Sequence, residues 1–169
     1  MTSLEAVLRP ALCEGKPADR VLAAHFRDHR EYGARDRRFI SETVFAVLRW
    51  WGWLRRLECC PECRLLQSDQ PVPPKDLARL ALSAAVLDDH DLRSELWEAF
   101  CHLAAVAPAR ISALRAKLTP TERLGDLWLL FGTPVKPPPA WRDLVPPWVL
   151  GKVTVTSQHN RLIDYLQRR

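Results

Sequence analysis

The sequence predicts an all-α protein, a bundle of about six or seven helices. Apolar residues recur at the i, i+3 and i+4 spacing of helices that are buried on one face. We find no segment with the alternating pattern of a half-buried strand, and prolines and glycines separate the periodic stretches. The chain has 169 residues, of which 47% are apolar, so it can bury one sizeable core. We therefore expect one helical domain over residues 1–132.

Two helices are predicted at the start of the chain. The first has an apolar stripe from Leu4 to Leu12, and Pro10 is expected to kink or shorten it because proline lacks a backbone N–H. The second covers residues 18–31 and is broken by Gly33.

The third helix follows Gly33 and has the clearest periodicity, from Phe39 to Leu54. Trp51 falls within its apolar stripe, whereas Trp50 and Trp53 fall to the sides. We interpret these tryptophans as core or rim residues, and only Trp50 or Trp53 would be placed to meet a nucleic-acid base.

Residues 58–74 contain four prolines and are predicted to be a loop. Further helices are expected over residues 75–87, 92–105, 108–118 and 119–131. A proline-rich connector, 133–153, and a C-terminal tail, 154–169, complete the chain. The core should take the following residues from these helices: Val21, Leu22, Phe26, Phe39, Val44, Val47, Leu48, Trp51, Leu80 and Leu96.

The charge distribution indicates a polyanionic partner. Lys and Arg outnumber Asp and Glu by 25 to 20, and 20 of these 25 cations are arginine. Residues 9–56 carry eleven cations and six acids, so the positive excess is concentrated there. Arginine binds phosphate with two parallel hydrogen bonds and stacks on bases, so RNA is the partner class to consider first.

The sequence lacks the usual signals of membrane, secreted and zinc-binding proteins. No stretch approaches the roughly 20 apolar residues of a membrane span, and the N-terminus does not resemble a signal peptide. We expect a cytoplasmic protein without a membrane partner, with its five cysteines reduced. Cys59, Cys60 and Cys63 lack the second pair that a zinc site needs, so no metal is expected, and the role of their loop stays open. The acidic run at 88–91 is predicted to end one helix and cap the next through Asp91.

One segment resembles a known family. "PADRVLAAHFRDHREYGARDRRFISETVFAVLR", Pro17 to Arg49, resembles the opening of the N-terminal NusB-like domain in the Sun/RsmB family of RNA (cytosine-5) methyltransferases. "LVPPWVLGKV", Leu144 to Val153, is similar to the segment that leads into the family's methyltransferase domain. The resemblance implies a NusB-like fold that recognises ribosomal RNA.

The catalytic motifs of that family have no counterpart here. Its enzymes bind S-adenosylmethionine on a glycine-rich turn and use cysteines in Pro-Cys and Thr-Cys contexts, whereas this chain has isolated glycines and the reversed Cys60-Pro61. We expect no catalysis and no cofactor. The chain is interpreted as a substrate-recognition domain without its catalytic partner: a fragment, a truncated gene product or a stand-alone paralogue.

The predicted RNA contacts are arginines near the two ends of the third helix: Arg30, Arg35, Arg37, Arg38, Arg55 and Arg56. The alternative for Arg38 is neutralisation by Glu42 on the helix surface, and Asp36 suits the positive helix end. The alternative function is a NusB-like protein-docking module in transcription antitermination or ribosome assembly. Its partner would be a methyltransferase or a ribosome-assembly protein. The two functions differ in whether the arginines converge on one face or an apolar patch is exposed.

Overall fold

The computed structural model describes residues 2–54, 66, 70–91, 94–114, 122, 126, 130 and 131. These residues form helices and the turns between them, with no strand in the described part, so the predicted all-α class is confirmed. The helices are α1 (Thr2–Cys13), α2 (Ala18–Asp28), α3 (Ala34–Leu54), α5 (Pro74–Leu87), α6 (Glu95–Ala104) and α7 (Pro108–Leu114).

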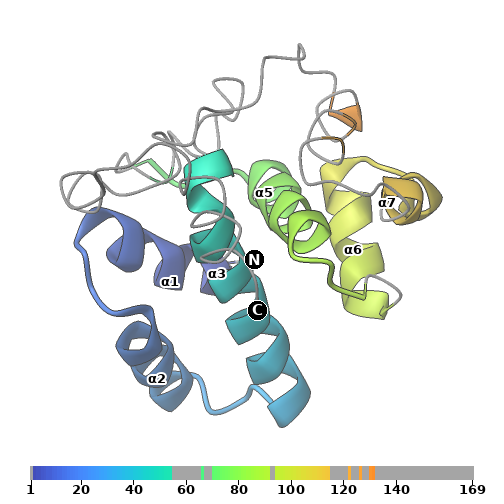
Figure 1. Cartoon of the computed structure of the whole chain (residues 1–169). Coiled ribbons are helices and arrows are strands. Elements are labelled where there is room, and N and C mark those ends of the chain that lie inside the picture. The colour runs from blue at the N-terminus through green and yellow to red at the C-terminus, as the bar shows by residue number, and fades with distance from the viewer. Residues whose placement is uncertain are drawn as a thin grey trace, which may run out of the picture.

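Helix α5 lies between α3 and α6 (Figure 1). Its sequence, PKDLARLALSAAVL, is apolar around nearly the whole circumference after the first turn, which is typical of a helix with neighbours on several sides. Every residue from Leu80 to Leu87 is buried. Alanine and Ser83 allow close packing, and the Ser83 hydroxyl donates to the Arg79 carbonyl at 2.8 Å, so this hydroxyl is buried with a hydrogen-bond partner.

Helices α1 and α2 pack against α3 and against each other. From α1, Leu4, Val7 and Leu8 are buried at helical spacing, and Leu22 is their counterpart in α2. Pro10 does not end α1, which continues to Cys13, so the expected shortening is wrong. Gly15, with φ of +64°, provides the left-handed turn into the next segment.

The start of α1 holds the chain before α5 in place. Glu5 and Arg9 form an i, i+4 ion pair at 2.6 Å. Glu5 also accepts from the Val72 backbone N–H at 3.2 Å, and Arg9 donates to the Gln70 carbonyl at 2.7 Å. Two charged side chains on one helix therefore satisfy backbone groups of a segment more than sixty residues away in sequence.

Asp88 joins the end of α5 to α3. Its buried carboxylate accepts from Arg49, from Trp50 Nε1 at 3.1 Å and from His90 Nε2 at 2.9 Å. Burial alone would raise the pKa of Asp88. The hydrogen bonds from His90, Arg49 and Trp50 and the charge of Arg49 outweigh that effect and hold the pKa well below the ordinary carboxyl range.

The helices predicted up to Leu114 are confirmed with shifted ends, whereas Leu66, within the predicted loop 58–74, is helical. Helix α2 ends at Asp28 rather than at residue 31, and α6 begins at Glu95 rather than at residue 92. Asp91 is therefore not the N-cap of α6, and this prediction was wrong. Ser94, a favoured N-cap residue, and the acidic Glu95 mark the true start.

The predicted core is correct in part. Leu22, Val44, Val47 and Leu80 are buried. The other predicted core residues are only partly buried: Val21, Phe26, Phe39, Leu48, Trp51 and Leu96. The connector at 133–153 and the tail at 154–169 lie outside the described residues. Glu122, Asp126 and Leu130 are helical, within the segment 119–131 that was predicted as a helix.

Candidate nucleic-acid interface

The turn between α2 and α3 is fixed by two local hydrogen bonds. The Gly33 backbone N–H donates to Asp36 Oδ2 at 3.1 Å, so Asp36 closes the first turn of α3 as the acidic member of a capping box does. Arg37 Nε donates to the Tyr32 carbonyl at 2.8 Å. The guanidinium carbon of Arg37 also lies 5.7 Å from the centre of the Phe26 ring, which ties α3 to α2.

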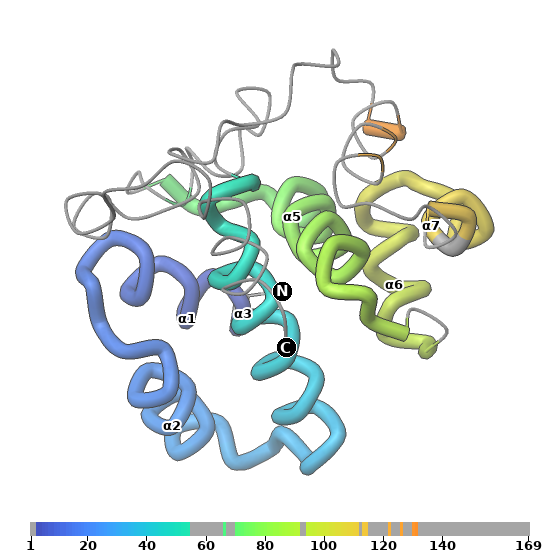
Figure 2. Tube along the Cα trace, viewed as in Figure 1, coloured from blue at the N-terminus to red at the C-terminus, as the bar shows by residue number. Residues whose placement is uncertain are grey.

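These contacts separate Arg37, which is bonded within the fold, from the exposed Arg30 and Arg35. Arg37 is half-buried, and no carboxylate of the described residues pairs with it, as the sequence indicated; a backbone carbonyl is its partner instead. Arg30 and Arg35 are exposed, and neither forms an ion pair within the described part of the chain. Arg30 lies in the turn between α2 and α3, and Arg35 lies in the first turn of α3; Figure 2 shows how this turn joins the two helices.

Arg38 forms the surface pair that the sequence offered as an alternative. Its Nε donates to Glu42 Oε1 at 2.9 Å, but the two side chains are 80% and 50% exposed. An exposed i, i+4 pair contributes only about 0.3 to 0.5 kcal/mol. Arg38 can therefore exchange Glu42 for an external anion at little cost.

Arg27 is a further member of this surface that the sequence reasoning did not select. It lies exposed in the last turn of α2, three residues before Arg30, and within the described residues it has no ion pair. The same run of charge that drew attention to Arg30 also contains Arg27. We call Arg27, Arg30, Arg35 and Arg38 the arginine corner.

The other residues considered for contact with RNA are Arg55, Arg56, Trp50 and Trp53. Arg55 and Arg56 lie outside the described residues, and so do Cys59, Cys60 and Cys63. Trp50 and Trp53, the tryptophans considered for base stacking, are only 5% and 8% exposed, whereas Trp51 is half-buried. The predicted register was wrong because α3 packs against α1 and α2 and also against α5, so its buried surface is wider than one stripe.

Three rings contact one another where α2 ends and the turn to α3 begins. The ring of His25 is 4.4 Å from that of His29 and 6.0 Å from that of Tyr32, between ring centres. His25 Nε2 is buried and has no hydrogen-bond partner among the described residues. Burial and the neighbouring His29 lower the pKa of His25, against the opposite effects of Asp28 and Glu31.

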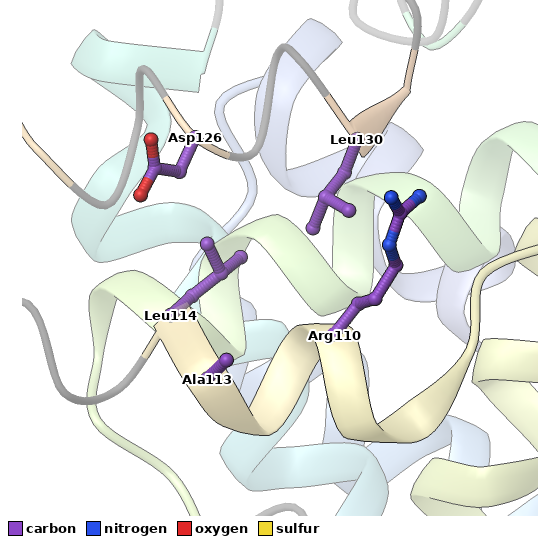
Figure 3. Close-up of a pocket in the computed structure, with 5 residues that line it drawn as sticks. All are labelled: Arg110, Ala113, Leu114, Asp126 and Leu130. Carbon is purple, nitrogen blue, oxygen red and sulfur yellow. The ribbon is translucent and has the colours of Figure 1, made fainter.

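Two hollows are found among those of the described surface. An open one of about 320 Å³ lies beside α7, where Arg110 extends alongside Leu130 and Asp126 stands across from Leu114 (Figure 3). The other, of about 170 Å³, is lined by residues of α1, α3 and α6 and of the α2–α3 turn. In the described ranges no three His, Cys, Asp or Glu side chains gather as a metal site would require.

None of the helices among the described residues is long and apolar enough to cross a membrane. No protein-family model, no curated protein and no solved structure matches this chain.

Proposed function

We propose that this chain is a non-catalytic RNA-binding domain that holds structured RNA by its phosphates at the arginine corner. The observation that carries the proposal is the position of Arg35. It lies in the first turn of α3, at the positive end of the helix dipole, where a cation is disfavoured by about 0.3 to 1 kcal/mol. No ion pair within the described residues compensates for this. An external anion at this position would remove the penalty.

The other members of the arginine corner extend the same cationic surface. Arg27 lies in the last turn of α2, Arg30 lies in the turn that follows α2, and Arg38 follows one turn after Arg35 in α3. Four arginines thus lie within twelve residues around one turn. Two of the acids there have other partners, since Asp36 accepts from Gly33 and Glu31 pairs with His29 at 2.9 Å, and Asp28 is the remaining acid. Ribosomal RNA as the class of ligand rests on the resemblance of residues 17–49 to the Sun/RsmB family.

The protein-docking alternative has less support from the described surface. Only two large apolar side chains there are strongly exposed, Phe45 at 41% and Leu103 at 40%, and they belong to different helices, α3 and α6. Docking through apolar contacts needs a contiguous patch. We therefore favour RNA over a protein as the partner of this domain.

Absence of catalysis remains part of the proposal. Catalytic groups are often recognised by strongly shifted pKa values in a cleft. The most strongly shifted carboxyl in the described residues is Asp88, which is committed to three donors that join α5 to α3. The Cys101 thiol is buried, and burial, followed by the charge of Glu98, raises its pKa, which disfavours the reactive thiolate.

Binding of an RNA hairpin, followed by fluorescence anisotropy over a series of salt concentrations, tests the proposal. Phosphate contacts release counterions, so the logarithm of the association constant should fall linearly with the logarithm of the salt concentration. Competition by unrelated RNAs should be effective, because phosphates carry little sequence information. If the chain does not bind the hairpin even at low salt, the proposal is wrong.

A further inference from the structure

The smaller hollow shares the α2–α3 turn with the arginine corner. Tyr32 and Asp36 contribute to its lining, and they belong to the same turn as Arg30 and Arg35. Its volume of about 170 Å³ is below the range of about 300 to 1,000 Å³ that is usual for sites of drug-sized ligands. A hollow of this size suits one planar ring rather than a whole cofactor.

The lining of the hollow includes aromatic rings beside the aliphatic Leu4, Ile40 and Leu96. Phe39 and Phe100 both line it, with ring centres 5.5 Å apart and planes inclined by 67°. Trp97 packs behind Phe39 at 4.9 Å between ring centres and fixes its orientation. Phe39 is only partly buried, so part of its ring is open to contact. Aromatic side chains that are held in this way are the usual platforms for unpaired RNA bases.

The hollow also offers hydrogen-bonding groups. Ser3 Oγ and Tyr32 Oη lie 2.6 Å apart, and since each hydroxyl has one hydrogen, one of the two remains to be donated. One oxygen of Asp36 accepts from Gly33, and the other has no partner within the described part of the chain. A donor and a carboxylate acceptor match the mixed donor and acceptor edge of a nucleobase.

We propose that this hollow accepts one unpaired base of the bound RNA while the arginine corner holds the adjoining phosphates. The inference rests on the proposed function and adds a preference to it: RNA with an unpaired nucleotide binds more tightly than fully paired RNA. A nucleotide fits the hollow better than an apolar side chain does. The hollow offers aromatic rings, a hydroxyl donor and a carboxylate oxygen, and the same turn carries arginines that have no ion pair among the described residues.

The test compares two RNA hairpins that differ in one position. One carries a single-nucleotide bulge, and the other has an abasic residue at the same place, so that charge and backbone are equal. Stacking on an aromatic side chain contributes enough that the parent protein should bind the base-containing hairpin at least about fivefold more tightly. Equal affinity for both hairpins overturns the base pocket and leaves phosphate binding intact. Failure to bind either hairpin overturns the proposed function and the pocket with it.

A pair of variants on α6 ties the preference to this hollow. Leu96 lines the hollow, and Leu96→Trp should fill it; Leu103→Trp adds the same side chain at an exposed position of the same helix. Leu96→Trp should lose the preference for the base and keep the salt dependence, and Leu103→Trp should keep both. A Leu96→Trp protein with the parent's helical signal that still prefers the base contradicts the proposal. If that variant does not fold, the comparison of the two hairpins with the parent protein decides.

Discussion

Arg37 donates from Nε to the backbone carbonyl of Tyr32 at 2.8 Å and thereby closes the turn between α2 and α3. This arginine stabilises the fold, whereas Arg35, two residues earlier, has no such contact. We expect Arg37→Ala to lower the free energy of unfolding by about 1 to 2 kcal/mol, since it removes a charge-assisted hydrogen bond and the contact with Phe26.

Urea denaturation followed by circular dichroism measures this difference. Arg35→Ala is the matched control and should not lower the free energy of unfolding; removal of an exposed cation from the positive end of α3 should raise it by up to about 1 kcal/mol. Equal stability of the two variants would show that the contact of Arg37 with Tyr32 does not hold the turn.

Substitution of Asp88 should lower the free energy of unfolding more than substitution of most other polar residues. Asp88→Ala leaves the buried Trp50 Nε1 and the Arg49 and His90 donors without their acceptor, and we expect a loss of about 3 kcal/mol. Glu98→Ala, exposed on α6, is the control and should change stability little.

The contribution of Asp88 to stability should decrease in acid. Its folded-state pKa lies below its ordinary value of 3.8, so its contribution to stability is present above that pH and is lost as the pH falls below it. Acid unfolding of the Asp88→Asn variant should therefore depend less steeply on pH between about 4 and 2 than that of the parent. Identical slopes would contradict the assignment.

The lowered pKa of His25 predicts a change in the free energy of unfolding closer to neutral pH. Its folded-state pKa is lowered from 6.5, so the folded protein binds fewer protons than the unfolded chain, and stability should fall as the pH drops through 6.5. His25→Phe should reduce this loss between pH 7.5 and 5.5, measured by urea denaturation at each pH. His102→Gln, at an exposed position, should retain the parent's pH dependence; if His25→Phe does so as well, His25 is not the cause.

Ala105 follows α6 in the left-handed conformation, with φ of 58°. A residue with a Cβ is strained there by about 1 to 2 kcal/mol, whereas glycine is not. After allowance for the greater freedom of glycine in the unfolded chain, Ala105→Gly should raise the free energy of unfolding by about 0.5 to 1 kcal/mol. A thermal melt tests this, and a lower melting temperature for the variant would contradict it.

The helices could be predicted from the sequence because their signals are local. Apolar spacing located α3 and α5 to within a residue or two, and Pro74 marks the first turn of α5. Even the pairing of Arg38 with Glu42 followed from a separation of four residues.

What could not be predicted depends on contacts between distant segments. Asp88 meets Arg49 across 39 positions, and Glu5 meets Val72 across 67, so no spacing rule finds either contact. Trp50 is buried because α5 packs on its side of α3, which the periodicity of α3 alone does not reveal. At the candidate site, the charge run identified the arginines. Only the structure separates Arg37, which is bonded to Tyr32, from Arg35, which has no ion pair among the residues that the structure describes.

The central claim, that unpaired arginines at the α2–α3 turn bind RNA phosphates, is tested most directly by the salt dependence of a double variant. In Arg30→Ala/Arg35→Ala, the slope of log association constant against log salt should decrease in magnitude by about 1.4 to 1.8, because each lost phosphate contact contributes about 0.7 to 0.9. The charge-matched control, Arg20→Ala/Arg110→Ala, removes two exposed arginines from elsewhere in α2 and α7 and should keep the parent's slope. If the Arg30/Arg35 variant binds the hairpin with the affinity and slope of the parent, the arginine corner is not an RNA-binding surface.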